Sequence, residues 1–223
     1  MEEIRYRIRR SPRATRIRVT VDPARGVEVV LPRRAGDHEA LAAVRELRTW
    51  IERRVEEQER ARAAVIARGA TVPYLDEVLR LVAQPGRERV HRHGDELLLP
   101  AVDAQPALER WYRRAARAEI APRLDRATAL VGTSYSRLTI RGQRTRWASC
   151  ARSGAMSFNW RLLLAPEAVL DYVVWHEVSH LEVMDHSPRF WALLAERCPD
   201  HREHGRWLRR HAQTLVLPPA TLA

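Results

Sequence analysis

Four side chains near residue 180 have types and spacing that suit metal-assisted chemistry. His176, Glu177 and His180 form the pattern H-E-x-x-H, and His186 follows six residues later. On a helix, His176 and His180 at positions i and i+4 leave the same face, so their imidazoles can bind one zinc ion. Glu177 projects beside that face, where it can take a proton from a water on the metal. If the chain turns back after Met184, His186 supplies the third ligand and leaves one position for water or substrate.

The segment that carries this pattern is apolar on most positions, which is typical of a buried helix. Its apolar residues are Val169, Leu170, Tyr172, Val173, Val174, Trp175, Val178 and Leu181. Buried ionisable side chains need partners, and a metal ion is one. The alternative, a pair of core histidines with ordinary hydrogen bonds, explains neither Glu177 nor His186. The sequence therefore favours a site for one zinc ion per chain.

The composition is that of an ordinary soluble globular protein, with 223 residues of which 45% are hydrophobic and 30% are charged. The net charge is +11, and all 39 basic residues are arginine. An arginine-only composition is more typical of a GC-rich coding sequence than of selection at each site. The basic charge is therefore weak support for nucleic-acid binding.

The two cysteines, Cys150 and Cys198, form no disulfide framework, which favours a reducing compartment. The first residues lack the apolar core of a signal peptide. No run approaches the roughly 18 apolar residues of a membrane span. We therefore expect a cytoplasmic protein that does not enter the membrane, and nothing in the sequence assigns an oligomeric state.

The N-terminal part of the chain alternates apolar and polar residues in several short segments, which predicts strands. The predicted strands cover residues 4–8, 16–21, 27–31, 78–82 and 97–99. Helical spacing predicts one helix from Asp37, as its N-cap, to about Arg68, ended by Gly69. The pair His91 and His93 is interpreted as a surface feature of a polar strand.

A linker at residues 101–105 separates these strands from a long predicted helix. Pro106 opens this helix, Gly132 caps it, and Pro122 predicts a break within it. Further strands are predicted at residues 137–140, 145–150 and 156–162. A sheet placed directly before the metal motif has an edge strand that can hold an extended peptide by main-chain hydrogen bonds.

A new helix is predicted directly after the metal motif, with Ser187 as N-cap and Pro188 at its first position. This restart changes the chain direction next to His186, as the third-ligand geometry requires. A last, arginine-rich helix is expected from His201 to about Gln213.

Several segments of the chain resemble the YgjP-like metallopeptidase family, which is related to the SprT-like and WLM zinc metalloproteases. The resemblance covers about residues 106–211. It rests on residues 144–150 (RTRWASC), 157–162 (SFNWRL), 171–180 (DYVVWHEVSH) and 186–191 (HSPRFW). Ala148 stands where the family has glycine, and we expect its methyl group to narrow the cleft beside the substrate strand.

The resemblance implies a zinc-dependent hydrolase with a gluzincin-like or metzincin-like core. His176, His180 and His186 would be the zinc ligands, and Glu177 the general base. We therefore expect an α+β fold in two domains. Residues 1–100 would form a small antiparallel β-rich region with one long helix, and residues 101–223 a zincin-like metallopeptidase domain with an HExxH helix.

The leading hypothesis is hydrolysis of a peptide or protein substrate. Stabilising the oxyanion needs a further donor, and Arg146, Asn159 and Tyr172 are the candidates. Asp171 or Glu167 is a candidate for orienting a ligand imidazole.

Two other functions remain open. Some relatives carry a nucleotide pyrophosphatase label, and Arg144, Arg146 and Arg161 could hold the phosphates of UTP, although no glycine-rich phosphate loop is visible. A DNA-associated protease or a nucleic-acid-binding protein would agree with the charge and the SprT-like relation. The sequence has no zinc ribbon, helix-turn-helix signal or aromatic stacking motif to support nucleic-acid binding.

Overall fold

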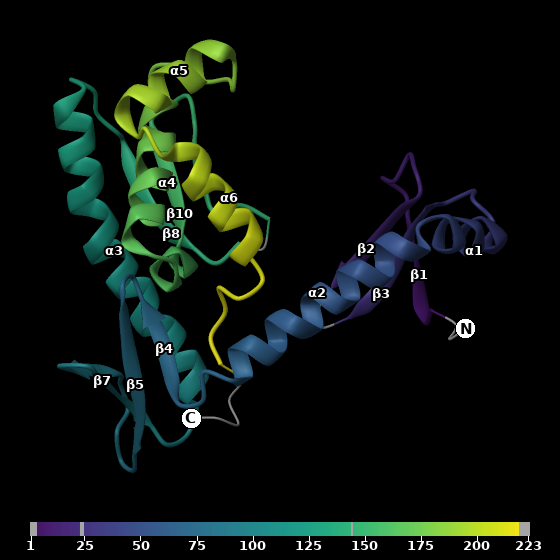
Figure 1. Ribbon diagram of the computed structural model, residues 1–223, viewed down its shortest axis with the longest axis horizontal. Helices are drawn as coiled ribbons and strands as arrows, with labels where there is room; N and C mark the ends of the chain where they lie inside the picture. Colours follow the sequence, from purple (N-terminus) through teal and green to yellow (C-terminus); the bar gives the residue numbers. More distant parts are fainter. Residues whose placement is uncertain (1–3, 23–24, 144, 219–223) are drawn as a thin grey trace. The chain divides into compact units, whose positions relative to one another are not determined.

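The computed structural model describes residues 4–22, 25–143 and 145–218 (Figure 1). Its contacts divide the chain into one unit of residues 1–64 and a second of residues 65–223. The sequence had suggested a division after residue 100. The structure places it earlier because strands between residues 71 and 100 share a hydrophobic core with the helices that follow. The fold is α+β, as expected.

The N-terminal unit contains a three-stranded sheet of β1 (Tyr6–Ser11), β2 (Arg18–Asp22) and β3 (Gly26–Pro32). The strand order is β1-β3-β2, with β1 parallel and β2 antiparallel to β3. Alternate apolar residues of β2 and β3 face the helices, which is the half-buried pattern that the sequence predicted. The buried residues of this core are Val19, Val27, Val29, Leu31, Ala40, Val44 and Ile51.

The single helix expected after Asp37 is two helices, α1 (Asp37–Glu46) and α2 (Arg48–Ile66). The interruption at Leu47 costs little hydrogen bonding, because its amide still donates to the carbonyl of Ala43 at 3.0 Å and its carbonyl accepts from Ile51 at 2.9 Å. The apolar stripe runs through the interruption, so sequence periodicity does not reveal it. Gly36 rather than Asp37 is the N-cap of α1.

The second unit begins with a four-stranded sheet of order β4-β5-β7-β6. Its strands are β4 (Thr71–Tyr74), β5 (Glu77–Gln84), β6 (His91–His93) and β7 (Glu96–Pro100). The turn after β4 is fixed to a distant segment, because the amide of Leu75 donates to the carbonyl of Leu163 at 2.7 Å. His91 and His93 are exposed on the edge strand, in agreement with a surface feature.

A long helix, α3 (Ala104–Leu130), follows this sheet and lies alongside α4 in Figure 1. It continues through Pro122, so the predicted break is wrong. Pro122 and Ala118 are both exposed, and water can therefore satisfy the Ala118 carbonyl that a proline at position i+4 leaves without an amide partner. Gly132 follows the helix with φ of +67°, as a helix-terminating glycine does.

The metal motif is preceded by a small sheet of order β8-β10-β9, made of β8 (Arg137–Arg141), β9 (Ala148–Cys150) and β10 (Ala155–Asn159). The chain then forms the 3₁₀ helix η1 (Trp160–Leu164), where the sequence had predicted a strand to residue 162. The remaining helices are α4 (Glu167–Ser179), α5 (Pro188–Arg197) and α6 (His201–His211).

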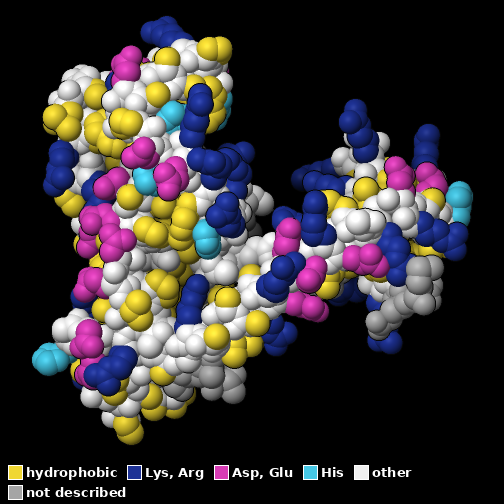
Figure 2. Space-filling model, viewed as in Figure 1, with side chains coloured by type: hydrophobic (Ala, Val, Ile, Leu, Met, Phe, Trp, Pro, Cys, Tyr) yellow, Lys and Arg dark blue, Asp and Glu magenta, His cyan; other side chains and the backbone are white. Residues whose placement is uncertain are grey.

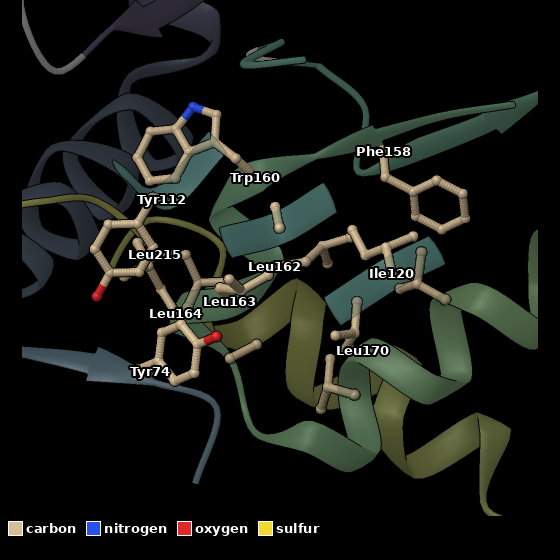
Figure 3. Close-up of a cluster of buried hydrophobic side chains, with 14 of the residues drawn as sticks. Tyr74, Tyr112, Ile120, Phe158, Trp160, Leu162, Leu163, Leu164, Leu170 and Leu215 are labelled. Atoms are coloured by element: carbon tan, nitrogen blue, oxygen red, sulfur yellow. The ribbon is translucent and has the colours of Figure 1, made fainter. Parts of the chain in front are cut away.

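The core of this unit joins its sheets to its helices (Figure 3). Tyr112 of α3 and Trp160 of η1 are almost fully buried, with ring centroids 5.7 Å apart. The hydroxyl of Tyr112 donates to the carbonyl of Pro73 at 2.5 Å, which ties α3 to β4. Leu215, after the last helix, also lies in this cluster. Among the described helices, none is long and apolar enough to cross a membrane.

Candidate metal centre

Helix α4 places the first two histidines and the glutamate of the motif. Its residues Val169, Leu170, Val173, Val174 and Val178 are buried and fix the helix against the core. His176 and Glu177 lie in its last turn, and His180 is its C-cap residue. The helix ends there because the next segment turns: the amide of Leu181 donates to the carbonyl of Val178 at 3.1 Å, and that of Val183 to Ser179 at 3.0 Å.

The loop after this turn returns His186 to the other two histidines. Val183 anchors the loop, since its side chain is buried against Phe190 and Leu194. The carboxylate of Asp185 accepts from the amide of Ser187 at 2.9 Å. Helix α5 then begins with Ser187 as N-cap and Pro188 at its start, which confirms the predicted restart.

The three histidines form a compact group of nitrogen donors. One nitrogen from each of His176, His180 and His186 lies within 4.8 Å of the other two. The Nε2 atoms of His176 and His186 are 3.1 Å apart. Two nitrogens on one tetrahedral zinc ion at about 2.0–2.1 Å are about 3.3 Å apart. The donor set and its spacing therefore fit a zinc ion.

Two of the three imidazoles, those of His176 and His180, have a lowered pKa, which favours the neutral form that binds a metal. Burial, followed by the neighbouring His180 and His186, lowers the pKa of His176 to about 3. Burial likewise lowers the pKa of His180. The Nδ1 of His180 lies 3.0 Å from the carbonyl of Val183, which can only accept, so Nδ1 carries the hydrogen and Nε2 presents its lone pair.

Phe190 and Trp191 pack against the histidine group from α5. Phe190 is fully buried and its ring stacks on His180, with centroids 4.5 Å apart and an interplanar angle of 24°. Its centroid is 4.9 Å from those of both His176 and His186. The three imidazoles therefore share one aromatic contact that limits their rotation.

Glu177 is a buried carboxyl beside the histidine group. Its exposed fraction is 5%, and its Oε2 has no hydrogen-bond partner in the part of the chain that the structure describes. Burial raises its pKa to about 8. On β9, burial raises the pKa of Cys150 to about 11, and the charge of Glu177 adds to this effect, which places β9 within electrostatic reach of Glu177. Strand β9 forms one edge of its sheet.

The proposed oxyanion donors have different surroundings. The side-chain amide of Asn159 donates to the carbonyl of Gln143 at 2.7 Å and to that of Arg146 at 3.3 Å, so it holds the loop before β9. The side chain of Arg146 is exposed. Tyr172 is half-buried, with its ring centroid 6.0 Å from that of His176. Tyr172 is therefore the candidate that lies against the histidine group.

The proposed orienting carboxylates bind an arginine. Asp171 and Glu167 form ion pairs with Arg123 of α3, the first at 3.0 Å. The imidazole of His180 is oriented instead by a hydrogen bond from its Nδ1 to the carbonyl of Val183. A backbone partner has no sequence signature, so this contact was not predicted. Phe190 lies in the segment 186–191 that resembles the family, but no role in the site was predicted for it.

The structure describes two of the three arginines considered for phosphate binding, Arg146 and Arg161. Arg144 lies outside the described residues. Arg161 places its guanidinium 5.2 Å from the ring centroid of Trp160, a core residue. The arrangement favours chemistry by the histidines and Glu177.

Comparisons with known proteins identify the family of the chain. A solved structure, the metallopeptidase zymogen of Pyrococcus abyssi abylysin, is similar at 21% identity with a TM-score of 0.38, over 44% of this chain and 99% of that chain. A likeness at this TM-score carries no weight for fold or activity. No curated protein matches the chain. The profile of the YgjP-like family, metallopeptidase domain, matches residues 15–211. Because this match spans most of the sequence, the chain belongs to the YgjP-like family and is a metal-dependent peptidase.

Proposed function

We propose that the protein is a zinc-dependent peptidase in which His176, His180 and His186 hold one zinc ion and Glu177 is the general base. The observation that carries the proposal is the convergence of three imidazoles beside a buried carboxyl that has no partner among the described residues. When bound, the ion supplies Lewis acidity that polarises a peptide carbonyl and acidifies water.

The burial of Glu177 gives it the proton affinity of a base near neutral pH. A pKa of about 8 makes its carboxylate a stronger proton acceptor than an exposed glutamate. Positive charge placed beside it favours the ionised form, which can then accept a proton and return it to the leaving amine.

The remaining parts of the site suit an extended peptide. Strand β9 is an edge strand, and its outer main-chain groups can pair with a substrate strand. Burial raises the pKa of Tyr172, so its hydroxyl stays protonated and can donate a hydrogen bond to the substrate. The substrate would therefore lie between β9 and the histidine group.

The first experiment measures zinc content in protein that carries no histidine tag. We expect about one zinc per chain, lost in His176→Ala and in His186→Ala. Glu177→Gln keeps the ion but lowers peptide hydrolysis by at least about 100-fold. Glu196→Gln, which removes an exposed carboxylate of α5, is the matched control and keeps both. Wild-type hydrolysis by the Glu177 variant, or full zinc content in both histidine variants, would refute the proposal.

A further inference from the structure

A second feature adjoins the histidine group: a groove of about 660 Å³ between α4, α5 and α6. Tyr172 and Trp191 form its aromatic sides, and Gly205 lies at its base. The face of α6 contributes Arg202, Arg206 and Arg209, and His201 completes the lining. We call it the α6 groove.

The three arginines of the α6 groove recur at positions i, i+4 and i+7, so they lie on one face of the helix. All three are exposed, and none forms an ion pair within the described ranges. Other arginines of the same unit are paired, as Arg123 is with Asp171 and Arg197 is with Glu182. Figure 2 shows basic side chains gathered beside histidine over this part of the molecule. The groove therefore holds positive charge that the protein does not neutralise.

Gly205 leaves space in the groove for a neighbouring hydroxyl and guanidinium. A Cβ at this position would lie 3.2 Å from the Oη of Tyr172 and 3.6 Å from the Nη1 of Arg209. The hydroxyl of Tyr172 and the guanidinium of Arg209 therefore both lie beside the backbone of Gly205. The charge of Arg209 also opposes the burial that raises the pKa of Tyr172.

The α6 groove shares its aromatic sides with the histidine group. The ring centroid of Trp191 is 5.7 Å from that of His186, and the centroid of Tyr172 is 6.0 Å from that of His176. On its other side, Trp191 stacks on the buried ring of His201 at 6.0 Å, which fixes the indole. An extended peptide advances about 3.3 Å per residue. A side chain in the groove would thus belong to a residue within about three positions of the bond at the metal site.

We propose that the α6 groove is a substrate subsite that binds a carboxylate of the peptide, so that the enzyme selects acidic substrates. The inference rests on the proposed function. Arginine binds a carboxylate through two parallel hydrogen bonds. The carboxylate comes either from an aspartate or glutamate side chain near the cleaved bond or from the C-terminus of the peptide.

The test uses matched pairs of short peptides. One series moves a single glutamate, or the neutral isostere glutamine, through a neutral peptide whose C-terminus is amidated. A second pair compares a free C-terminal carboxylate with its amide. Cleavage by the zinc-loaded wild type gives kcat/KM, and calorimetry with zinc-loaded Glu177→Gln gives binding without turnover.

We expect the zinc-loaded enzyme to prefer the carboxylate-bearing peptide of one pair by about tenfold in kcat/KM, since replacing a hydrogen bond to a neutral group by one to a charged group strengthens binding by about this factor. The double variant Arg206→Gln/Arg209→Gln loses the preference but still cleaves the neutral peptides. Arg210→Gln removes an exposed arginine of α6 outside the groove and keeps the preference. Arg206→Glu shifts the preference toward peptides with lysine, a gain that misfolding cannot produce.

The outcomes separate the two proposals. Equal cleavage and equal binding of every pair overturn the subsite and leave the peptidase proposal standing. Carboxylate-dependent binding without cleavage of any peptide supports the subsite and refutes the peptidase. Peptides that are neither bound nor cleaved refute both. A preference that survives in the double variant also overturns the subsite.

Discussion

The burial of Glu177 predicts that ionisation of its carboxyl destabilises the metal-free protein at alkaline pH. The carboxyl is 5% exposed, and its Oε2 has no partner in the described chain. Ionising it in place removes the hydration of the charge without giving it a hydrogen bond. Glu177→Gln substitutes a neutral group of nearly the same shape. The variant should therefore be more stable than the wild type, without metal, at pH values above the ordinary carboxyl pKa of 4.5.

The size of the effect follows from the pKa. The pKa of Glu177 rises from 4.5 to about 8 on folding, and each pKa unit corresponds to about 1.4 kcal/mol. Below pH 4.5 both states are protonated and the two proteins differ little. Between pH 4.5 and about 8 the folded state holds the proton that the unfolded state has lost, so wild-type stability falls as the pH rises. The full difference above this range is about 5 kcal/mol.

His176 titrates with the opposite sign, so the two effects must be separated. Its pKa falls from 6.5 to about 3 on folding, and the folded state then binds fewer protons than the unfolded state between these values. Stability from His176 therefore rises with pH across that interval. Because both proteins contain His176, its contribution largely cancels when Glu177→Gln is compared with wild type at each pH.

The measurement is urea unfolding with a metal chelator at a series of pH values, followed by tryptophan fluorescence. Six of the seven tryptophans belong to the unit of residues 65–223, so the signal reports mainly on the unit that holds Glu177. Glu196→Gln is the control and should give a difference that does not depend on pH. If the Glu177→Gln difference were also independent of pH, the carboxyl would be hydrated or paired in the folded protein, and the argument from burial would be wrong.

Three further predictions concern the surroundings of the site. Phe190→Leu removes the ring stacked on an imidazole and should weaken zinc binding by about tenfold in a chelator competition assay, whereas unchanged affinity would contradict a positioning role. Gly205→Ala should lower kcat/KM because its methyl meets the hydroxyl of Tyr172 at 3.2 Å, whereas an unchanged kcat/KM would show that this hydroxyl takes no part in binding or catalysis. Arg123→Ala leaves three carboxylates without their shared partner and should reduce the free energy of unfolding by about 2 kcal/mol. If urea titrations showed that the free energy of unfolding falls by only a few tenths of a kcal/mol, water would replace these ion pairs.

Much of the candidate site can be predicted from the sequence because it depends on contacts between residues close together in the chain. Helical spacing places His176 and His180 on one face, and the Ser187-Pro188 start predicts the change of direction that returns His186. The contacts that refine the site are not local. The carbonyl of Val183 has no residue-type signature, and the position of Phe190 under the imidazoles depends on how α5 packs.

The fold shows the same limit. Period-two and helical patterns located the strands and helices, but pairing is a long-range property. Strand β1 runs parallel to β3 across the intervening hairpin, and β10 runs parallel to β8. Sequence alternation is identical for parallel and antiparallel neighbours of one sheet face. The expectation of an antiparallel N-terminal region therefore does not hold for β1 and β3, and the orientation of β10 was not predicted. The grouping of β4–β7 with α3 likewise depends on contacts such as that between Tyr112 and Pro73.

Burial lowers the pKa of His176 and raises the pKa of Glu177. Both shifts favour the uncharged form of the group. Without a metal, the apolar surroundings keep both groups uncharged near neutral pH, so the buried site carries no isolated charge. His176 then needs to lose no proton to bind a cation. Glu177, in contrast, becomes a carboxylate more readily once positive charge lies beside it. Near neutral pH, Glu177 would thus be fully ionised only in the metal-loaded protein. Proton transfer by Glu177 would therefore depend on the presence of the ion.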